Sequence, residues 1–157
     1  MANAKILEGK TVLIVDDEPD VLEALEETLE MCEIDTSTEY EKANQLLNSK
    51  SYDLAVLDIM GVNGYDLLAV ADRKGIPAVM LTAHALSANN FAKSMDEGAC
   101  AYLPKDRLFE IDVFLTDVLE DGGKNIGLLG KWFDRLKGYY DNKFGPGWLD
   151  EYKGAWH

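Results

Sequence analysis

Several reactive side chains in this sequence directly follow short runs of apolar residues. The runs are residues 11–15, 54–57, 78–81 and 101–104, and the residues that follow them are Asp16, Asp17, Asp58, Thr82 and Lys105. Each run has the length and composition of a buried strand. If the strands are parallel, their carboxyl ends lie along one edge of the sheet, so these side chains converge.

Three carboxylates, a hydroxyl and an ammonium at one edge predict a phosphoryl-transfer site. Asp16 and Asp17 would repel the carboxylate of Asp58, and the pKa of one of these acids would rise unless a cation lies between them. Mg²⁺ is the expected cation, because it binds carboxylates together with water in octahedral geometry. Thr82 and Lys105 could then bond to the transferred group.

The elements that position these residues alternate between strands and amphipathic helices. Pro19 suits the first turn of a helix, because its missing N–H costs nothing there. Pro104 places the last strand at an edge of the sheet, since proline cannot donate to a neighbouring strand. A fourth strand is expected to start at Ile76-Pro77, and a weak edge strand over 34–38. Apolar spacing predicts helices over 19–32, 40–47, 65–73, 86–97 and 108–119. This alternation indicates an α/β fold with a parallel sheet covered on both faces.

Composition narrows the class of protein. The chain has 157 residues, of which 47% are hydrophobic and 28% charged, as in globular proteins. Its net charge of −14 argues against nucleic acid as a direct partner. No apolar run is long enough to cross a membrane, and no signal-peptide pattern opens the chain, so we expect a cytoplasmic location. Cys32 and Cys100 have no metal-binding spacing and are expected to be reduced and packed.

The charge is divided unevenly along the chain. Residues 1–121 carry 25 acids and 9 bases, a net of −16, whereas residues 122–157 carry 4 acids and 6 bases, a net of +2. The change falls at Asp121-Gly122-Gly123, which also resembles a helix stop. We therefore expect one domain over 1–121 and a C-terminal extension over 122–157.

Together, the motifs resemble the receiver domain of bacterial two-component response regulators. The resemblance covers residues 10–121 and rests on the order of Asp16-Asp17, Leu57-Asp58, Leu81-Thr82-Ala83 and the segment 98–105, each at a strand end. It implies the flavodoxin-like fold of five βα units, with strand order 2-1-3-4-5, to which the extension adds a helix.

The resemblance also implies a role for each site residue. Asp58 would accept a phosphoryl group from a histidine kinase or phosphotransfer protein. Asp17 would bind Mg²⁺ directly, Asp16 would hold it through water, and the backbone carbonyl of Met60 would be a further ligand. Thr82 and Lys105 would contact the phosphoryl group. Tyr102 stands at the switch position, where an aromatic ring turns inward when Thr82 is drawn to the phosphate.

Two features differ from the usual family pattern. The family has Met-Pro after its aspartate and a glycine eight residues on, whereas here Gly64 follows Asp58 after six residues without a proline. The loop is therefore expected to be two residues shorter. The family lysine is commonly followed by a cis proline, but Asp106 follows Lys105, and the bond between them could be trans or cis.

The leading hypothesis is a phosphorylation-controlled switch that binds a protein partner of unknown identity. We expect it not to be an enzyme, apart from slow self-catalysed phosphoryl transfer and dephosphorylation. An alternative is a receiver-like docking module that is never phosphorylated. A phosphatase resembling haloacid dehalogenases would need a second acid where Met60 stands. A dinucleotide-binding domain would need a G-x-G-x-x-G after a strand, which is absent.

The extension carries an aromatic pattern. Seven of its residues share one helical face: Ile126, Leu129, Trp132, Phe133, Leu136, Tyr139 and Tyr140. A face of this size is expected to be covered, by the chain's own domain or by a second copy or partner, with Trp132 and Phe133 as anchors. A homodimer is therefore possible. The extension is too small to be a catalytic or DNA-binding domain.

Overall fold

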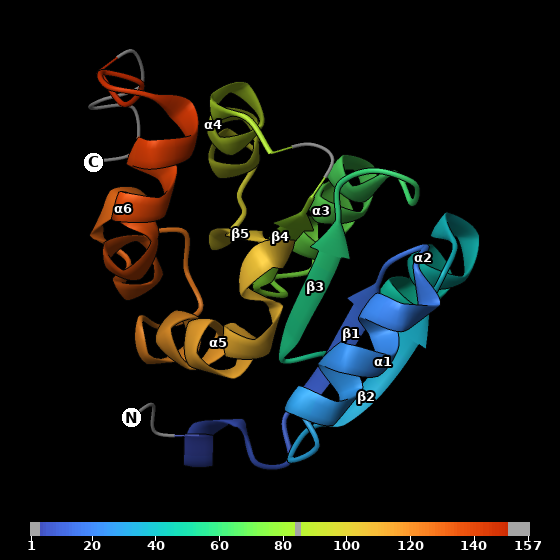
Figure 1. Ribbon diagram of the computed structural model, residues 1–157. Coiled ribbons are helices and arrows are strands. Elements are labelled where there is room, and N and C mark those ends of the chain that lie inside the picture. The colour runs from blue at the N-terminus through green and yellow to red at the C-terminus, as the bar shows by residue number, and fades with distance from the viewer. Residues whose placement is uncertain (1–3, 84–85, 151–157) are drawn as a thin grey trace.

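A computed structural model describes residues 4–83 and 86–150 (Figure 1). His84, expected in an exposed loop, and the end of the extension beyond Asp150 lie outside the described residues. Five parallel strands form one sheet in the order β2-β1-β3-β4-β5, which confirms the flavodoxin-like topology. The strands are β1 (Thr11–Val15), β2 (Glu33–Ser37), β3 (Leu54–Asp58), β4 (Ala78–Thr82) and β5 (Ala101–Pro104).

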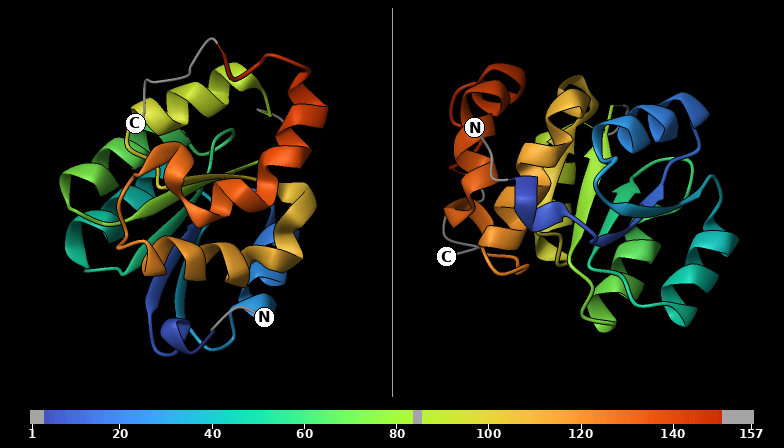
Figure 2. Two further views of the ribbon diagram at one scale, coloured as in Figure 1. Left: turned by 90° about the vertical axis from the view of Figure 1, so that its left-hand side faces the viewer. Right: turned by 90° about the horizontal axis from the view of Figure 1, so that it is seen from below.

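The central strands are apolar along their length because helices cover both faces of the sheet. Every residue of β3 and β4 is buried. Helices α1 (Pro19–Thr28) and α5 (Ile111–Glu120) lie on one face, and α2 (Tyr40–Ser49) and α3 (Gly64–Arg73) on the other, as the right panel of Figure 2 shows. Helix α4 (Ala88–Asp96) lies beside β5.

Several boundaries differ from the sequence-based expectation, and the first helix ends at Thr28 rather than at Cys32. Strand β4 begins at Ala78, so Ile76 and Pro77 precede it. Helix α4 begins after Ser87, whose side chain accepts a hydrogen bond from Asn90 N, a cap that the apolar spacing does not reveal. The expected fifth helix is divided, because residues Lys105–Glu110 form a 3-10 segment, η2, before α5 starts.

The extension forms a short 3-10 turn, η3 (Gly127–Leu129), and then helix α6 (Lys131–Phe144). The expectation that Ile126 and Leu129 share the helical face was wrong. Gly130 is extended and separates them from α6, and Leu129 is 69% exposed. Helix α6 ends at Gly145, whose positive φ of 89° suits glycine.

Helix α6 packs on its own domain, outside the edge strand β5 and beside α4 and α5 (Figures 1 and 2). Trp132, Phe133, Leu136 and Tyr140 are all buried. The Arg135 guanidinium forms two hydrogen bonds with the carboxylate of buried Asp117 on α5, at 2.6 and 3.2 Å. The apolar face of α6 is thus covered within the same chain, so it does not require a dimer to cover it.

Candidate functional site

The carboxyl edge of the sheet brings together the acids that the sequence singled out. Asp58 is the last residue of β3, and Asp16 directly follows β1, the neighbouring strand. One carboxylate oxygen from each of Asp16, Asp17 and Asp58 lies within 4.8 Å of the others. Asp16 and Asp58 are buried, whereas Asp17 is exposed. Buried acids so close together require a positive charge nearby.

Lys105 supplies a positive charge from the end of β5. Its Nζ lies 2.8 Å from Asp16, 3.3 Å from Asp58 and 3.7 Å from Glu18. Burial alone would lower the pKa of Lys105, but hydrogen bonds and the charges of Asp16 and Asp58 raise it overall, so the side chain stays protonated. Glu18 is a pocket residue that sequence reasoning missed, although it directly follows Asp17.

The environment of Asp58 suits a nucleophilic carboxylate that is ionised near neutral pH. Burial and the negative charge of Asp16 raise its pKa to about 6, although Lys105 opposes this shift. Burial likewise raises the pKa of Asp16, against the effect of Lys105. Both acids are therefore less acidic than in water, and a cation bound between them would favour their ionised forms.

The short loop after β3 closes through two left-handed residues. Gly61 has φ of 85° and Asn63 has φ of 53°. A Cβ at Gly61 would lie 2.3 Å from Asp17 Oδ2, so the loop backbone runs directly against that carboxylate. A Cβ at Gly64 would lie 2.1 Å from the backbone oxygen of Asp58, so only glycine fits there. The neighbouring Met60 has an exposed side chain.

Thr82 and Tyr102 lie on the two strands beyond β3. Thr82 is the last residue of β4, is buried, and pairs in register with Pro104 of β5. Tyr102 is fully buried, and its hydroxyl accepts a hydrogen bond from Ser87 N at 3.1 Å. The ring therefore points inward in this structure. Burial raises the pKa of Tyr102 far above its ordinary value, so its hydroxyl stays protonated.

The bond between Lys105 and Asp106 is trans, because the structure contains no cis peptide bond within the described ranges. The side chain of Asp106 turns toward α6, where it accepts a hydrogen bond from the Tyr139 hydroxyl at 2.6 Å. Sequence reasoning could not find this contact, because no spacing rule relates η2 to a helix in the extension.

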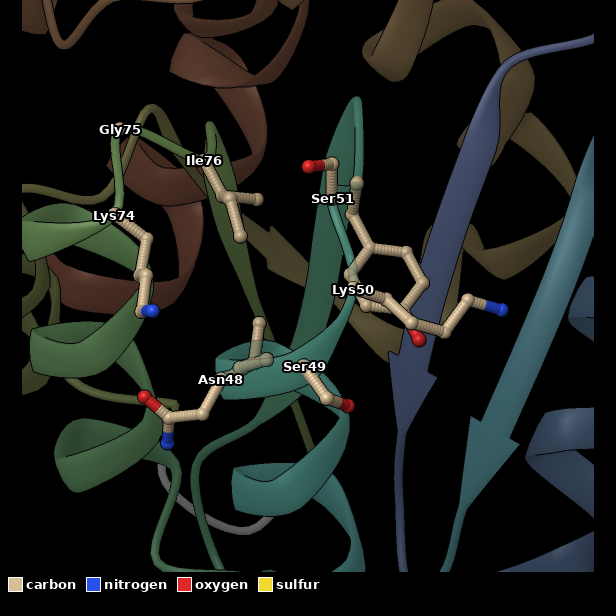
Figure 3. Close-up of a pocket in the computed structure, with 9 residues that line it drawn as sticks. Asn48, Ser49, Lys50, Ser51, Lys74, Gly75 and Ile76 are labelled. Carbon is tan, nitrogen blue, oxygen red and sulfur yellow. The ribbon is translucent and has the colours of Figure 1, made fainter.

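A separate hollow lies at the opposite, amino-terminal edge of the sheet, next to the ends of α2 and α3 (Figure 3). Lys50 and Lys74 both contribute to its lining, and the side chain of Lys50 extends away from Lys74 and Asn48. The Nζ atom of Lys50 forms an ion pair with Asp35 Oδ2 at 2.5 Å. None of the described residues that line this hollow is acidic, so the acid cluster at the carboxyl edge is the candidate site.

Comparisons with known proteins agree with this geometry. The family model of the response regulator receiver domain matches residues 12–117. The two-component response regulator ARR18 of Arabidopsis thaliana is 36% identical over 103 residues, which are 62% of this chain and 16% of that protein. ORR24 of Oryza sativa is 32% identical over 104 residues, with the same coverage. The chain thus matches only a small part of these curated relatives.

Solved structures show the same fold. A CheY-like receiver domain protein from Methanospirillum hungatei is 26% identical with a TM-score of 0.60, over 73% of this chain and 100% of that one. A response regulator from Chloroflexus aurantiacus is 28% identical with a TM-score of 0.62, over 70% and 96% of the two chains. None of the described helices is long and apolar enough to cross a membrane. With its five-stranded parallel sheet and its acidic carboxyl edge, this chain belongs to the response regulator receiver domain family.

Proposed function

We propose that this protein is a phosphorylation-controlled switch in which Asp58 accepts a phosphoryl group from a phosphohistidine of a histidine kinase or phosphotransfer protein. The observation that carries the proposal is the contact of Lys105 Nζ with both Asp16 and Asp58, at 2.8 and 3.3 Å. This contact places the positive charge of Lys105 beside Asp58, whose negative charge would increase on phosphorylation. A phosphoryl group adds about −1.5 to −2 of charge and three acceptor oxygens.

In the proposed step, a carboxylate oxygen of Asp58 attacks the phosphorus atom and forms a P–O bond. The P–N bond of the phosphohistidine breaks, and its electron pair stays on the imidazole. With a pKa of about 6, Asp58 is ionised at neutral pH and available to attack. Lys105 would donate to one phosphoryl oxygen, and the hydroxyl of Thr82 to another, which stabilises charge as it develops.

The acid cluster fits Mg²⁺. Its donors are carboxylate oxygens, which this hard cation prefers, and one of the three acids is exposed to solvent, where water can complete the coordination. Asp16, Asp17, Asp58 and the carbonyl of Met60 would hold the ion, which when bound neutralises phosphoryl charge. The contact between the Gly61 backbone and the Asp17 carboxylate supports the place of Met60, because the two residues are adjacent.

Phosphorylation would change the surface that a partner protein binds. Thr82, the last residue of β4, and Lys105, which directly follows β5, would carry the change from Asp58 to these two strands. An unphosphorylated docking module is the competing function. We also propose that residues 1–121 form the receiver domain, with residues 122–157 as its helical extension, and that the protein works in the cytoplasm.

Intact-mass spectrometry tests the proposal. The purified protein is incubated with Mg²⁺ and acetyl phosphate, and we expect the wild type to gain the mass of one phosphoryl group. Asp58→Asn should gain none, whereas Asp66→Asn, which changes an exposed acid on α3, should behave like the wild type. A wild type that is never modified would favour the docking module, and an Asp58→Asn variant that is still modified would overturn the assignment of the acceptor.

A further inference from the structure

Helix α6 is hydrogen-bonded to the segment that carries Lys105 on both sides of that residue, to a backbone oxygen before it and to a side chain after it. Before it, the hydroxyl of Tyr140 donates to the backbone oxygen of Tyr102 on β5. After it, the hydroxyl of Tyr139 donates to Asp106 Oδ2 at 2.6 Å. The two donors are neighbours on α6, and the two acceptors flank Lys105, so one turn of the helix holds both ends of this segment.

Beyond Lys105 and the half-buried Leu108, which packs against the core, the segment η2 is mostly exposed. No residue of η2 is fully buried, its first turn has no side-chain cap, and Arg107 departs from helical geometry with φ of −111° and ψ of 26°. Contacts with neighbouring elements, including α1 and α5, therefore contribute to its position. The guanidinium of Arg107 lies 5.6 Å from the centre of the Tyr139 ring, which adds a second contact with the same tyrosine.

Helix α6, in contrast, is firmly fixed to the domain. Trp132 is 1% exposed and Tyr140 is fully buried, with the ring of Phe91 of α4 at 5.3 Å from that of Tyr140. The two hydrogen bonds between Arg135 and Asp117 attach the helix to α5. A well-fixed helix can therefore help to hold the segment around Lys105 in place.

We propose that Tyr139 and Tyr140 are positioning residues for Lys105, so that the extension prepares the ammonium to receive the phosphoryl group. This inference rests on the proposed function of Asp58. To pair with a phosphoryl oxygen, the long side chain of Lys105 must be held in one geometry, which costs conformational entropy. Ordering the neighbouring residues in advance removes part of this entropy cost. Docking of α6 and binding of a phosphoryl group then favour each other.

Coupling of this kind is reciprocal, because each binding event changes the affinity of the other by the same factor. All three tryptophans, Trp132, Trp148 and Trp156, lie in residues 122–157. Intrinsic tryptophan fluorescence therefore reports on the extension and on its contact with α4, since Phe91 packs against both Trp132 and Trp148. A phosphoryl mimic bound at Asp58 should change this fluorescence, although no tryptophan lies in the pocket among the described residues.

The test measures the affinity for beryllofluoride in the presence of Mg²⁺, by titration calorimetry on the full chain. Tyr139→Phe and Asp106→Ala should each weaken binding about threefold to tenfold, which is the net contribution of one typical intramolecular hydrogen bond. Asp106→Asn keeps an acceptor oxygen and should restore most of the affinity. Mg²⁺ affinity, measured alone, should stay unchanged in all three variants.

Tyr52→Phe is the matched control, because the Tyr52 hydroxyl donates to Asp35 at 2.7 Å on the opposite edge strand, β2. It should leave both the affinity and the fluorescence change as in the wild type. If the wild type binds beryllofluoride and Tyr139→Phe and Asp106→Ala bind it equally well, the positioning role is overturned while the proposed function stands. If the wild type binds none, both are overturned.

Discussion

The Nζ atom of Lys105 lies 3.3 Å from Oδ1 of Asp58, and this ion pair joins the end of the edge strand β5 to the end of the central strand β3. The lysine side chain is only 9% exposed. Loss of the lysine would leave two buried acids without their cation, whereas loss of Asp58 would leave the lysine paired with Asp16 at 2.8 Å.

Lys105→Ala should therefore destabilise the protein in metal-free buffer, because Asp16 and Asp58 lose the cation between them. We expect a melting temperature below that of the wild type without Mg²⁺, and a partial recovery when Mg²⁺ is added. Differential scanning calorimetry with and without Mg²⁺ measures this. Lys93→Ala, which removes an exposed ion pair with Glu97 at 3.7 Å, serves as the control and should change little. Equal behaviour of the two variants would contradict the role of Lys105.

Asp58→Asn should stabilise the protein at neutral pH without metal. The pKa of Asp58 is about 6 in the folded state, compared with an ordinary value of 3.8 in the unfolded chain. Between these values the folded protein retains a proton that the unfolded chain has lost, so the free energy of unfolding falls as pH rises. At about pH 7.5 the variant avoids the free-energy cost of ionising the buried Asp58. We expect its free energy of unfolding to exceed that of the wild type by about 1 to 3 kcal/mol.

The gain should vanish at about pH 4, where the acid is largely protonated in the folded state and contributes little penalty. Urea unfolding at the two pH values checks both parts. A variant whose stability differs from that of the wild type by the same amount at both pH values would show that titration of Asp58 is not the cause.

Gly61→Ala should weaken Mg²⁺ binding. The added Cβ would lie 2.3 Å from Asp17 Oδ2, so the Asp17 carboxylate would have to move. Gly75→Ala is the matched control, since Gly75 also has a positive φ, of 72°, but its Cβ would meet nothing within 4 Å. Both changes should cost stability, by about 1 kcal/mol or more for an alanine at positive φ. Mg²⁺ titration followed by calorimetry should show a weaker affinity in Gly61→Ala alone. Similar losses in both variants would point to general backbone strain.

Much of the site could be predicted from the sequence because parallel strands place their ends together. Four apolar runs, together with the rule that parallel strands end at one edge, were enough to place Asp16, Asp58, Thr82 and Lys105. The start of α4 was predicted too early, because Leu86 fits the helical spacing while the polar cap at Ser87 sets the boundary.

The packing of the extension could not be predicted, because an acidic domain attracts a basic helix equally within one chain and between two. Helical spacing also extended the aromatic face too far, since it ignored the breaks at Gly127 and Gly130. The bond from Tyr140 to the Tyr102 backbone depends on how α6 crosses β5, and no local pattern encodes such a crossing.

Trp132→Ala should destabilise the protein by about 3 to 5 kcal/mol, as is usual when a buried aromatic side chain is truncated. Trp132 is 1% exposed and packs against Phe91 of α4 and Phe133 of α6. Leu129→Ala removes a side chain that is 69% exposed and should cost little. Urea unfolding of both variants measures the difference. A Trp132→Ala variant as stable as the wild type would show that α6 is not docked on the domain in solution.

Chemical trapping of the phosphorylated residue tests the central claim most directly. The protein is treated with Mg²⁺ and acetyl phosphate, and borohydride then reduces any acyl phosphate to an alcohol, which converts the aspartate concerned to homoserine. Peptide mass spectrometry locates the change. We predict homoserine at position 58 alone, at a level that falls in Lys105→Ala. Homoserine at position 16 or 17, or its absence from a protein that had gained phosphoryl mass, would contradict the assignment of Asp58 as the acceptor.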